Sequence, residues 1–476
     1  MSKEKNKKET KHRNLLGRIM AVVQLILSSI LVYQAGMLPV KYRVLLGVVL
    51  LAVFTVCFAL QTINNKAHII GNVISIMTII VLAVGMLGLG KINGFMSAIG
   101  GGGLKTDNMV VVVNVDDPAE TIEDAAGYKF AIVKTIDREN TNKMLEEVEN
   151  KTTSSLDINE YLTFDEMANA LLNGEVEGAV YNSAFDGLIE DSIENYQGKI
   201  KVIYQYGIVT EVEAEVEKEV ELDKGFNVYI SGIDVSGPIS TTSRSDVNII
   251  MSINPDTKQI LLTTTPRDYY VPIPGISGGV RDKLTHAGIY GVDASMRTLE
   301  ELYGIDISYY ARVNFTSLIK IVDILGGVDV NSEHSFSAQG YTFNKGVNHL
   351  NGEAALAFSR ERYSFADGDN QRGRNQEAVI EAIINKALSP EILKRAGSIL
   401  NSIGDSVETD MSTDEMNKLI AMQLSDNASW NIESQSVTGH GDTNSCFSSG
   451  SQQLYVMNPD NDSVSQASAK IREVVE

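Results

Sequence analysis

Three long apolar stretches near the N-terminus constrain the fold of this chain most strongly. They cover about residues 19–38, 44–60 and 69–89, and each approaches the roughly 20 residues that a helix needs to cross a bilayer. A cleaved signal peptide does not account for the first stretch, because two more apolar stretches follow it. A buried helical core is also disfavoured, since none of the stretches has a polar face. The sequence therefore predicts three transmembrane helices within residues 19–99.

The charges around these stretches predict how the chain is oriented. Residues 1–18 are rich in Lys and Arg, and the positive-inside rule keeps such a segment in the cytoplasm. Lys41 and Arg43 oppose this orientation, because they lie in a loop that must then be outside. After three crossings, everything beyond about Gly90 is extracellular. We thus expect a multi-pass cell-membrane protein with a basic cytoplasmic tail and with its chemistry outside the cell.

The rest of the chain is acidic and contains little cysteine. The formal net charge is -21, and the acidic residues follow the apolar stretches. This excess argues against non-specific nucleic-acid binding, which needs a basic surface. Cys57 lies in an apolar stretch and Cys446 lies near the end of the chain. We therefore expect neither a disulfide nor a zinc site. We also expect no nucleic-acid partner.

The pattern of residues 104–222 predicts a small α/β accessory domain. This region follows a glycine-rich joint at residues 100–103. Hydrophobic periodicity predicts strands over 109–115, 129–134 and 176–182 and helices over 140–149 and 164–172. Apolar and acidic residues then alternate over 209–223, which predicts a strand with one face in water. We find no catalytic set of residues in this region. An accessory or partner-binding role is favoured over a second active site.

Residues 223–476 show a longer alternation of strand and helix patterns. Strands are expected over 227–232, 247–253 and 259–265 and near residue 455. Helices are expected over 294–303, 316–325, 376–388, 414–423 and 465–474, and residues 354–362 are expected to lead from helix into strand. This alternation predicts a layered α/β domain of about 250 residues.

The search for chemistry leads to arginines rather than to a nucleophile. The sequence contains no nucleophile elbow, zinc-protease motif or phosphate loop, and its six histidines are scattered, each expected as a surface or polar-core residue. Guanidinium groups near a helix N-terminus suit a phosphate or diphosphate. Arg360 and Arg362, two positions apart, would share one face of an extended chain. The candidates are Arg244, Arg267, Arg360, Arg362, Arg372, Arg374 and Gln376.

These residues allow two interpretations. Taken singly, each arginine is better explained as a surface residue or an ion-pair partner. Taken together in an acidic extracellular chain, they predict an anion site. Asp234 and Asp246 could hold Mg²⁺, which usually takes one or two carboxylates together with substrate phosphate oxygens.

A series of motifs after residue 227 resembles one known family. They read "SRSDVNIIMSINP", "LLTTTPRDYYVPIPG", "DKLTHAGIYG", "ARVNFTSLIKIVDILGGVDV", "LNGEAALAFSRERY" and "GDNQRGRNQ", in the order of the family. On these motifs the chain resembles the LytR–CpsA–Psr family over about 250 residues. Its three apolar stretches make it most similar to capsular CpsA-type members.

The resemblance implies an architecture and an activity. The expected fold is α/β: three N-terminal transmembrane helices, the accessory domain, and an α/β sandwich with a central sheet between helices and an apolar tunnel for a polyprenyl chain. The expected activity is a metal-dependent phosphotransferase with Mg²⁺ or Mn²⁺. It would transfer a glycopolymer, in particular capsular polysaccharide, from undecaprenyl diphosphate to peptidoglycan. The membrane and capsule-assembly proteins would be further partners.

The resemblance also assigns roles to residues. Asp246 matches the metal-binding acid and Asp234 its acidic partner, which is also a candidate for the general base. Asp246, Arg267, Arg362 and Arg374 are the expected catalytic residues. Residues 367–369 in the loop "RYSFADGDNQRGRN" depart from the family. They could form a plain turn or supply a carboxylate to the pocket, and we favour the turn. The expected diphosphate-binding residues are Arg244, Arg267, Lys283, Arg360, Arg362, Arg372, Arg374 and Gln376.

Three other functions remain open on the sequence. A diphosphatase would use the same site but release the polymer to water, and an added peptidoglycan acceptor would distinguish it from a transferase. A non-enzymatic regulator or scaffold could bind a partner through its cytoplasmic tail, which is too short to bind DNA as a helix-turn-helix. A polyprenyl-lipid carrier would bind lipid without turnover, even after loss of Asp246.

Overall fold

The computed structural model divides the chain into two compact units. The first comprises Met1–Gly100, Ala387–Gly404 and Met411–Ala428, and the second comprises Gly101–Lys386, Asp405–Asp410 and Ser429–Glu476. The predicted accessory domain thus lies in the second unit; the division at residue 222 stays a prediction. The structure describes residues 2–35, 40–62, 67–99, 104–134, 136–211, 220–233, 239–365, 368–389, 392, 407–426 and 428–476.

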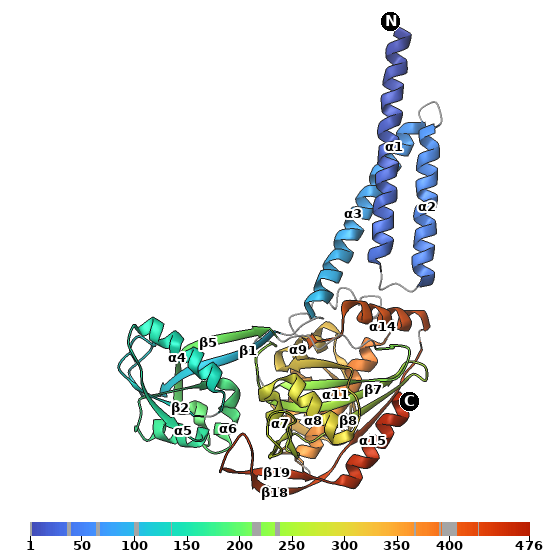
Figure 1. Cartoon of the computed structure of the whole chain (residues 1–476). Helices are drawn as coiled ribbons and strands as arrows, with labels where there is room; N and C mark the ends of the chain where they lie inside the picture. Colours follow the sequence, from blue (N-terminus) through green and yellow to red (C-terminus); the bar gives the residue numbers. More distant parts are fainter. Residues whose placement is uncertain are drawn as a thin grey trace. The chain divides into compact units, whose positions relative to one another are not determined.

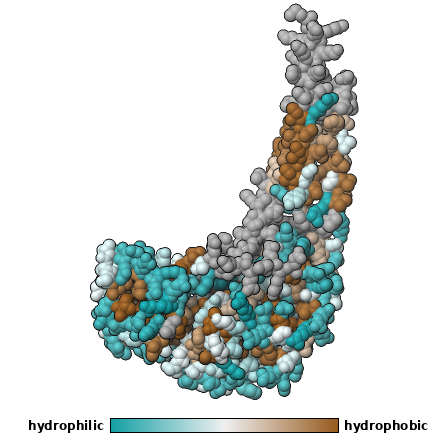
Figure 2. Space-filling view, viewed as in Figure 1, coloured by the Kyte–Doolittle hydropathy of each residue, from teal (hydrophilic) through white to brown (hydrophobic). Residues whose placement is uncertain are grey.

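The first unit contains three long N-terminal helices, as expected. They are α1 (Ser2–Gln34), α2 (Val40–Thr62) and α3 (Ala67–Ile99), and α1 packs against both others. Each is long and apolar enough to cross a membrane. Their outer side chains, such as Val44 and Val81, are exposed, and Figure 2 shows apolar surface along these helices. Such a surface is stable in lipid but not in water. A further helix, α14 (Thr413–Asp426), contacts α3.

The second unit begins with a five-stranded sheet in the order β3-β2-β4-β1-β5 (Figure 1). The inner strand β1 is antiparallel to both of its neighbours, β4 and β5. Its apolar run from Met109 to Val113 is buried on both faces, because Val110 and Val112 belong to one core and Met109, Val111 and Val113 belong to another. The elements are β1 (Leu104–Asn114), β2 (Lys129–Val133), α4 (Arg138–Thr152), β3 (Asp157–Tyr161), α5 (Phe164–Leu172), β4 (Gly178–Asn182), α6 (Asp186–Glu190) and β5 (Ile200–Glu211).

One prediction for this region was wrong. The alternation over 209–223 suggested a single strand, but β5 ends at Glu211, and residues 220–223 are not a strand. Residues 212–219 lie outside the described residues, as does the glycine-rich joint at 100–103. Alternation predicts a strand only where a neighbouring strand is present to pair with it.

The second sheet has the order β16-β11-β6-β7-β8-β17. Strand β7 is antiparallel to β6 and β8, whereas β11 and β17 join the sheet in parallel. Parallel pairing needs crossover connections, which the intervening helices supply. The strands are β6 (Phe226–Ile233), β7 (Ser245–Asn254), β8 (Gln259–Thr264), β11 (Tyr309–Asn314), β16 (Glu408–Thr409) and β17 (Asn431–Ser436).

Helices cover both faces of this sheet. On one face, Leu299 and Ile471 of the neighbouring helices α8 (Val292–Tyr303) and α15 (Asn461–Val475) form a core with Leu261 of β8. On the opposite face, Gly373 of α11 (Asp369–Ala387) approaches the methyl group of Thr264. Two further helices, α9 (Phe315–Ile324) and α10 (Gly352–Arg360), pack against each other. The expected helix-flanked central sheet is confirmed.

The expected boundary near residue 360 was wrong. Residues 354–362 do not lead into a strand: α10 ends at Arg360, and residues 361–365 form a bend and turns. The following helix begins at Asp369, seven positions before the expected start at Gln376. Its first turns carry the polar "DNQRGRNQ" segment, whose lack of apolar periodicity concealed the helix start.

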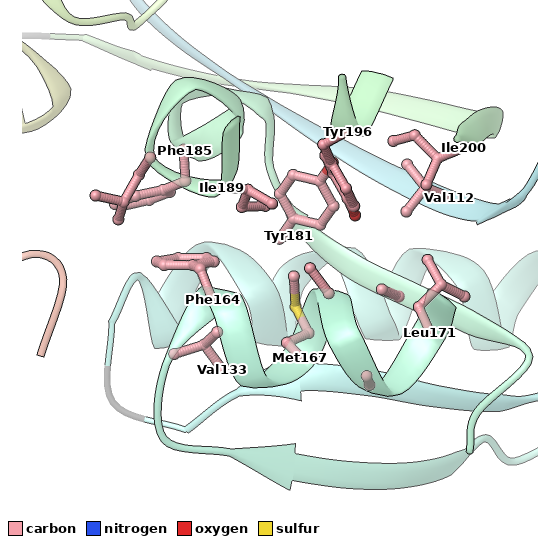
Figure 3. Close-up of a cluster of buried hydrophobic side chains, with 14 of the residues drawn as sticks. Val112, Val133, Phe164, Met167, Leu171, Tyr181, Phe185, Ile189, Tyr196 and Ile200 are labelled. Atoms are coloured by element: carbon pink, nitrogen blue, oxygen red, sulfur yellow. The ribbon is translucent and has the colours of Figure 1, made fainter. Parts of the chain in front are cut away.

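Separate two-stranded sheets accompany the second sheet, and one of them packs against the accessory domain. Strand β9 (Tyr270–Pro272) pairs with β10 (Arg281–Lys283), which leads into α7 (Leu284–Ala287) and the 3-10 turn Gly288–Tyr290. Strand β18 (Gly439–Ser445) pairs with β19 (Gln453–Pro459), and β12 (Val328–Ser332) pairs with β15 (Gly346–Leu350). Leu454 and Val456 of β19 belong to the core that contains Phe164, Tyr181 and Phe185 (Figure 3). The accessory domain therefore shares a core with the elements around the second sheet.

A close backbone contact fixes the entrance to β7. A Cβ atom on Gly288 would lie 2.5 Å from the backbone nitrogen of Ser245 and 2.7 Å from the carbonyl oxygen of Ser243. We predict that Gly288→Ala displaces this segment and lowers the free energy of unfolding by about 2 kcal/mol, because overpacked backbone cannot relax easily. Thermal unfolding of the detergent-solubilised chain measures the effect. Gly127→Ala is the control, since its Cβ would meet nothing within 4 Å; equal effects of the two changes would contradict the prediction.

Candidate functional site

A buried ion pair forms the centre of the candidate site. The Oδ1 atom of Asp246 lies 2.8 Å from Nη1 of Arg267, and the two side chains are 13% and 14% exposed. The pairing of β7 with β8 brings the two residues to the same end of the strand pair. It joins Ile249 to Thr264, the last residue of β8; Asp246 lies three residues before Ile249, and Arg267 lies in the turn three residues after Thr264. The hydroxyl of Thr285, in α7, donates a second hydrogen bond of 2.8 Å to the same carboxylate oxygen.

The surroundings keep Asp246 ionised. Burial alone would raise the pKa of its carboxyl group. The positive charges of Arg267 and Arg244, the hydrogen bond from Thr285 and the charge of Arg372 together hold the pKa below its usual value. Four residues that the sequence singled out, Asp246, Arg244, Arg267 and Arg372, are therefore close enough to interact electrostatically.

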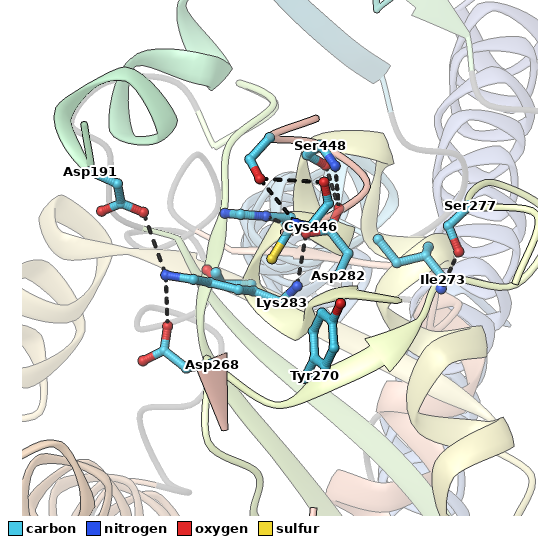
Figure 4. Close-up of polar contacts among 12 residues, drawn as sticks. Asp191, Asp268, Tyr270, Ile273, Ser277, Asp282, Lys283, Cys446 and Ser448 are labelled. Atoms are coloured by element: carbon cyan, nitrogen blue, oxygen red, sulfur yellow. Dashed lines mark hydrogen bonds and ion pairs between the residues drawn. The ribbon is translucent and has the colours of Figure 1, made fainter. Parts of the chain in front are cut away.

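A chain of charges continues from this pair to Lys283. The Nζ atom of Lys283 lies 3.3 Å from Oδ1 of Asp268, and that oxygen is 3.8 Å from Nε of Arg267. On its other side the same ammonium lies 3.5 Å from Oδ2 of Asp191, which belongs to the accessory domain (Figure 4). The Lys283 side chain is only 5% exposed. A buried ammonium in this position is stabilised by its two carboxylate partners.

A second buried pair holds the strand that carries Lys283. Asp282 is buried, and its carboxylate contacts Nδ1 of His286 at 2.6 Å and accepts hydrogen bonds from the backbone and hydroxyl of Ser448. Burial would raise the pKa of Asp282, but His286 and Ser448 lower it. His286 is thus a polar-core residue, which agrees with the sequence analysis. The pair anchors β10 to the β18–β19 hairpin.

Three of the expected arginines have other partners. The guanidinium of Arg360 lies 4.3 Å from the ring centre of Phe315, and that of Arg362 lies 4.7 Å from the ring of Tyr363. Arg374 contacts Glu333 at 3.2 Å. The suggestion that Arg360 and Arg362 share a face of an extended chain was wrong, because Arg360 is helical.

The two remaining candidates are placed as follows. Gln376 is partly buried in the middle of α11, not at its start. Asp234 lies outside the described residues, so its expected role as a metal ligand or a base stays a prediction.

The described residues can coordinate a metal ion only together with a bound substrate. They contain no group of three or more Asp, Glu, His or Cys side chains that could hold one. Mg²⁺, however, commonly binds one or two carboxylates and completes its coordination with phosphate oxygens and water. Asp246 supplies one ionised carboxylate beside several cations. The donor set thus suits an ion that is shared with a bound diphosphate.

Several residues at the site were not assigned a role from the sequence. Asp268 directly follows the candidate Arg267, and Thr285 lies in the family motif "DKLTHAG". Both are therefore next to residues that the sequence already singled out. Asp191 is in the accessory domain, and no local pattern marks it. Glu377, on α11, is buried and accepts a hydrogen bond of 3.2 Å from Ser436. Only the packing of α11 against the sheet shows that this glutamate is unusual.

The family follows from comparison with known proteins. The LytR–CpsA–Psr family model matches residues 193–472, well over half of the chain. The chain belongs to the LytR–CpsA–Psr family. The matched region contains β7, β8, α10 and α11, and with them every described candidate residue.

Individual relatives give the extent of the similarity. The polyisoprenyl-teichoic acid–peptidoglycan teichoic acid transferase TagU of Oceanobacillus iheyensis is 34% identical over 273 residues, which cover 56% of this chain and 78% of the relative. The TagU protein of Enterococcus faecalis is 38% identical over 213 residues, covering 44% of this chain and 69% of the relative. The crystal structure of B. subtilis TagU is 28% identical, covers 53% of this chain and 97% of its own, and gives a TM-score of 0.42.

The buried glutamate of α11 predicts a pH dependence. Burial raises the pKa of Glu377 to about 7, against hydrogen bonds from Thr264 and Ser436 that lower it. A carboxyl group whose pKa is raised by folding stabilises the fold below its unfolded pKa, near 4.5, and this stabilisation is lost as the pH rises through about 7. The free energy of unfolding of the wild-type chain should therefore fall between about pH 5 and pH 8. We expect Glu377→Gln to make this fall smaller by on the order of 3 kcal/mol.

Thermal unfolding of both forms across this pH range measures the difference. The exposed Glu473 of α15 offers the control, since Glu473→Gln also removes one carboxylate from a helix. If the stability of the wild-type chain and of Glu377→Gln changed with pH in the same way, this glutamate would not titrate as proposed.

Proposed function

We propose that this protein transfers a glycopolymer from a polyprenyl diphosphate carrier to peptidoglycan. The observation that carries the proposal is the Asp246–Arg267 pair together with the neighbouring Arg244 and Arg372, in the region shared with the family. The TagU relatives are named as transferases that move teichoic acid from a polyisoprenyl carrier to peptidoglycan. A diphosphate-linked substrate needs clustered guanidinium groups, and this site supplies them.

The reaction is a single displacement at phosphorus. A hydroxyl oxygen of peptidoglycan forms a bond to the phosphorus next to the glycan, the bond from that phosphorus to the bridging oxygen breaks, and polyprenyl phosphate leaves. The hydroxyl proton passes to a base or to water. Negative charge spreads over the phosphoryl oxygens in the transition state, and Arg267, Arg244 and Arg372 stabilise it from the protein side. The low exposure of Arg267 strengthens this effect, because little water screens its charge.

We further propose that the reaction depends on Mg²⁺ or Mn²⁺. Asp246 would hold the ion, since its carboxylate is ionised and lies where the diphosphate is expected. When bound, such an ion would neutralise charge on the phosphate oxygens. Arg267 would then share Asp246 with the metal, so the ion pair holds the carboxylate in position before the substrate arrives.

Capsular polysaccharide is the polymer that we propose, with capsule-assembly proteins as partners. The support is the three-helix anchor, which made the sequence most similar to capsular members of the family. The basic segment before the first helix supports an orientation with its soluble part outside the cell, where peptidoglycan is found. Lipid-linked capsular and teichoic acid precursors, offered in competition, would test the choice of polymer.

Two changes in the central ion pair test the transferase. We predict that Asp246→Ala or Arg267→Ala lowers the rate of polymer transfer by about 100-fold or more, because Arg267→Ala removes a cation beside the reacting phosphate and Asp246→Ala removes the proposed metal ligand. Transfer from a polyprenyl-linked glycan to added peptidoglycan is the measurement. Asp256→Ala, in the exposed turn between β7 and β8, is the control. Transfer at the wild-type rate in either site variant would refute this assignment.

The same assay separates the rival functions. A diphosphatase would release free polymer and give no joined product when peptidoglycan is added. A lipid carrier or a regulator would give no turnover at all, and the carrier would still bind lipid after Asp246→Ala.

Removal of divalent metal tests the cofactor separately. We predict that chelation lowers transfer by about 100-fold and that added Mg²⁺ or Mn²⁺ restores it, because phosphoryl transfer without a metal leaves negative charge uncompensated. Residual activity of Asp246→Ala should be insensitive to the chelator. Full activity after chelation would exclude the metal while leaving the transferase proposal intact.

A further inference from the structure

The accessory domain reaches the candidate site through one short segment. Helix α6 and the residue that follows it, residues 186–191, contact two of the site's cations. The backbone of Gly187 packs directly against the guanidinium group of Arg244, leaving no room for a side chain at that position. Four positions later, Asp191 forms the ion pair with Lys283. Arg244 and Lys283 both belong to the diphosphate-binding set that the family resemblance implies.

The segment is held firmly enough to position these cations. Leu188 and Ile189 of α6 are buried in the core that also contains Leu454 and Val456 of β19. Next to Asp191, the hydroxyl of Ser192 accepts a hydrogen bond from the side-chain amide of Gln452. These contacts, just before and just after Asp191 in the chain, hold the segment on the β18–β19 hairpin, to which the hydrogen bonds between Asp282 and Ser448 also anchor β10.

A continuous series of ion pairs connects this segment to the centre of the site. Asp191 contacts Lys283, Lys283 contacts Asp268, Asp268 contacts Arg267, and Arg267 contacts Asp246. The Asp191 side chain is 29% exposed and is the outermost member of this series. Lys283 thus has its charge divided between two carboxylates, one from each domain (Figure 4).

We propose that Asp191 is a positioning residue of the diphosphate site: its carboxylate holds the ammonium of Lys283 in place, so the accessory domain supplies part of the site. This inference rests on the proposed function. Asp191 has two opposing effects on the substrate. It keeps Lys283 where a phosphate oxygen of the reacting diphosphate meets it, and its negative charge weakens the attraction of any anion to the site.

The test separates binding from turnover in the full-length chain in detergent. With Asp191→Asn, we expect the site to gain net positive charge, so the Kd for inorganic pyrophosphate falls about threefold at low salt. This difference should disappear at about 0.5 M salt, because salt screens the partly exposed carboxylate. The kcat for polymer transfer should fall about tenfold, since Lys283 is no longer held. A merely structural role of Asp191 would weaken pyrophosphate binding and turnover together.

Three further variants sharpen the result. Asp191→Glu keeps the charge and should restore wild-type pyrophosphate affinity. Glu190→Gln removes a carboxylate from the same exposed helix end, one position away, and should leave both readouts unchanged. In a Lys283→Met background, Asp191→Asn should have no further effect, because the partner through which it acts is gone. If Lys283→Met does not fold, the first two comparisons decide alone.

Three outcomes would overturn the inference. Asp191→Asn could show wild-type binding and turnover, or Glu190→Gln could have the same effect as Asp191→Asn. Asp191→Asn could also keep its full effect in the Lys283→Met background. A wild-type chain that binds pyrophosphate but transfers no polymer would refute the proposed function instead. The pyrophosphate comparisons would then still decide whether Asp191 controls the charge of this site.

Discussion

The ion pair between Asp246 and Arg267 is the contact on which the candidate site depends. It forms where the start of β7 lies beside the turn that follows β8, an arrangement that depends on the antiparallel pairing of these two strands. A slip of one residue would turn the side chains of one strand to the other face of the sheet and break the pair. Loss of either partner would leave a nearly buried charge with weaker compensation, which destabilises a folded protein. The chemistry of the site is therefore coupled to the pairing of the second sheet.

Around this pair, cations and carboxylates alternate instead of forming a purely basic surface. Lys283 lies between Asp268 and Asp191, and Arg374 contacts Glu333. In a chain with a net charge of -21, these carboxylate partners hold the cations in place before a substrate is present. An incoming diphosphate would exchange carboxylate partners for phosphate oxygens, so the cations need little rearrangement to bind it.

Local patterns in the sequence predicted most of the elements. The buried run of β1 and the periodicity of α5 depend on the residues of one segment, and both elements were found where they were expected. The failures occurred where segments end. The alternation over 209–223 and the pattern around Arg360 each suggested strand, yet residues 220–223 and 361–362 are not strand. Strand formation depends on hydrogen bonds to another part of the chain, and a local pattern does not contain that information.

The sequence by itself determined the three apolar helices and the family motifs, and it predicted an arginine-rich anion site in an acidic chain. Each of these depends on residue type and spacing within one segment. The tertiary structure alone decided which charges meet. It placed Arg267, in the turn after β8, beside Asp246 of β7. It gave Arg360 an aromatic partner and brought Asp191 to Lys283 from 92 positions away. Contacts over such separations follow from the packing of two cores against each other, which no pattern within a segment can express.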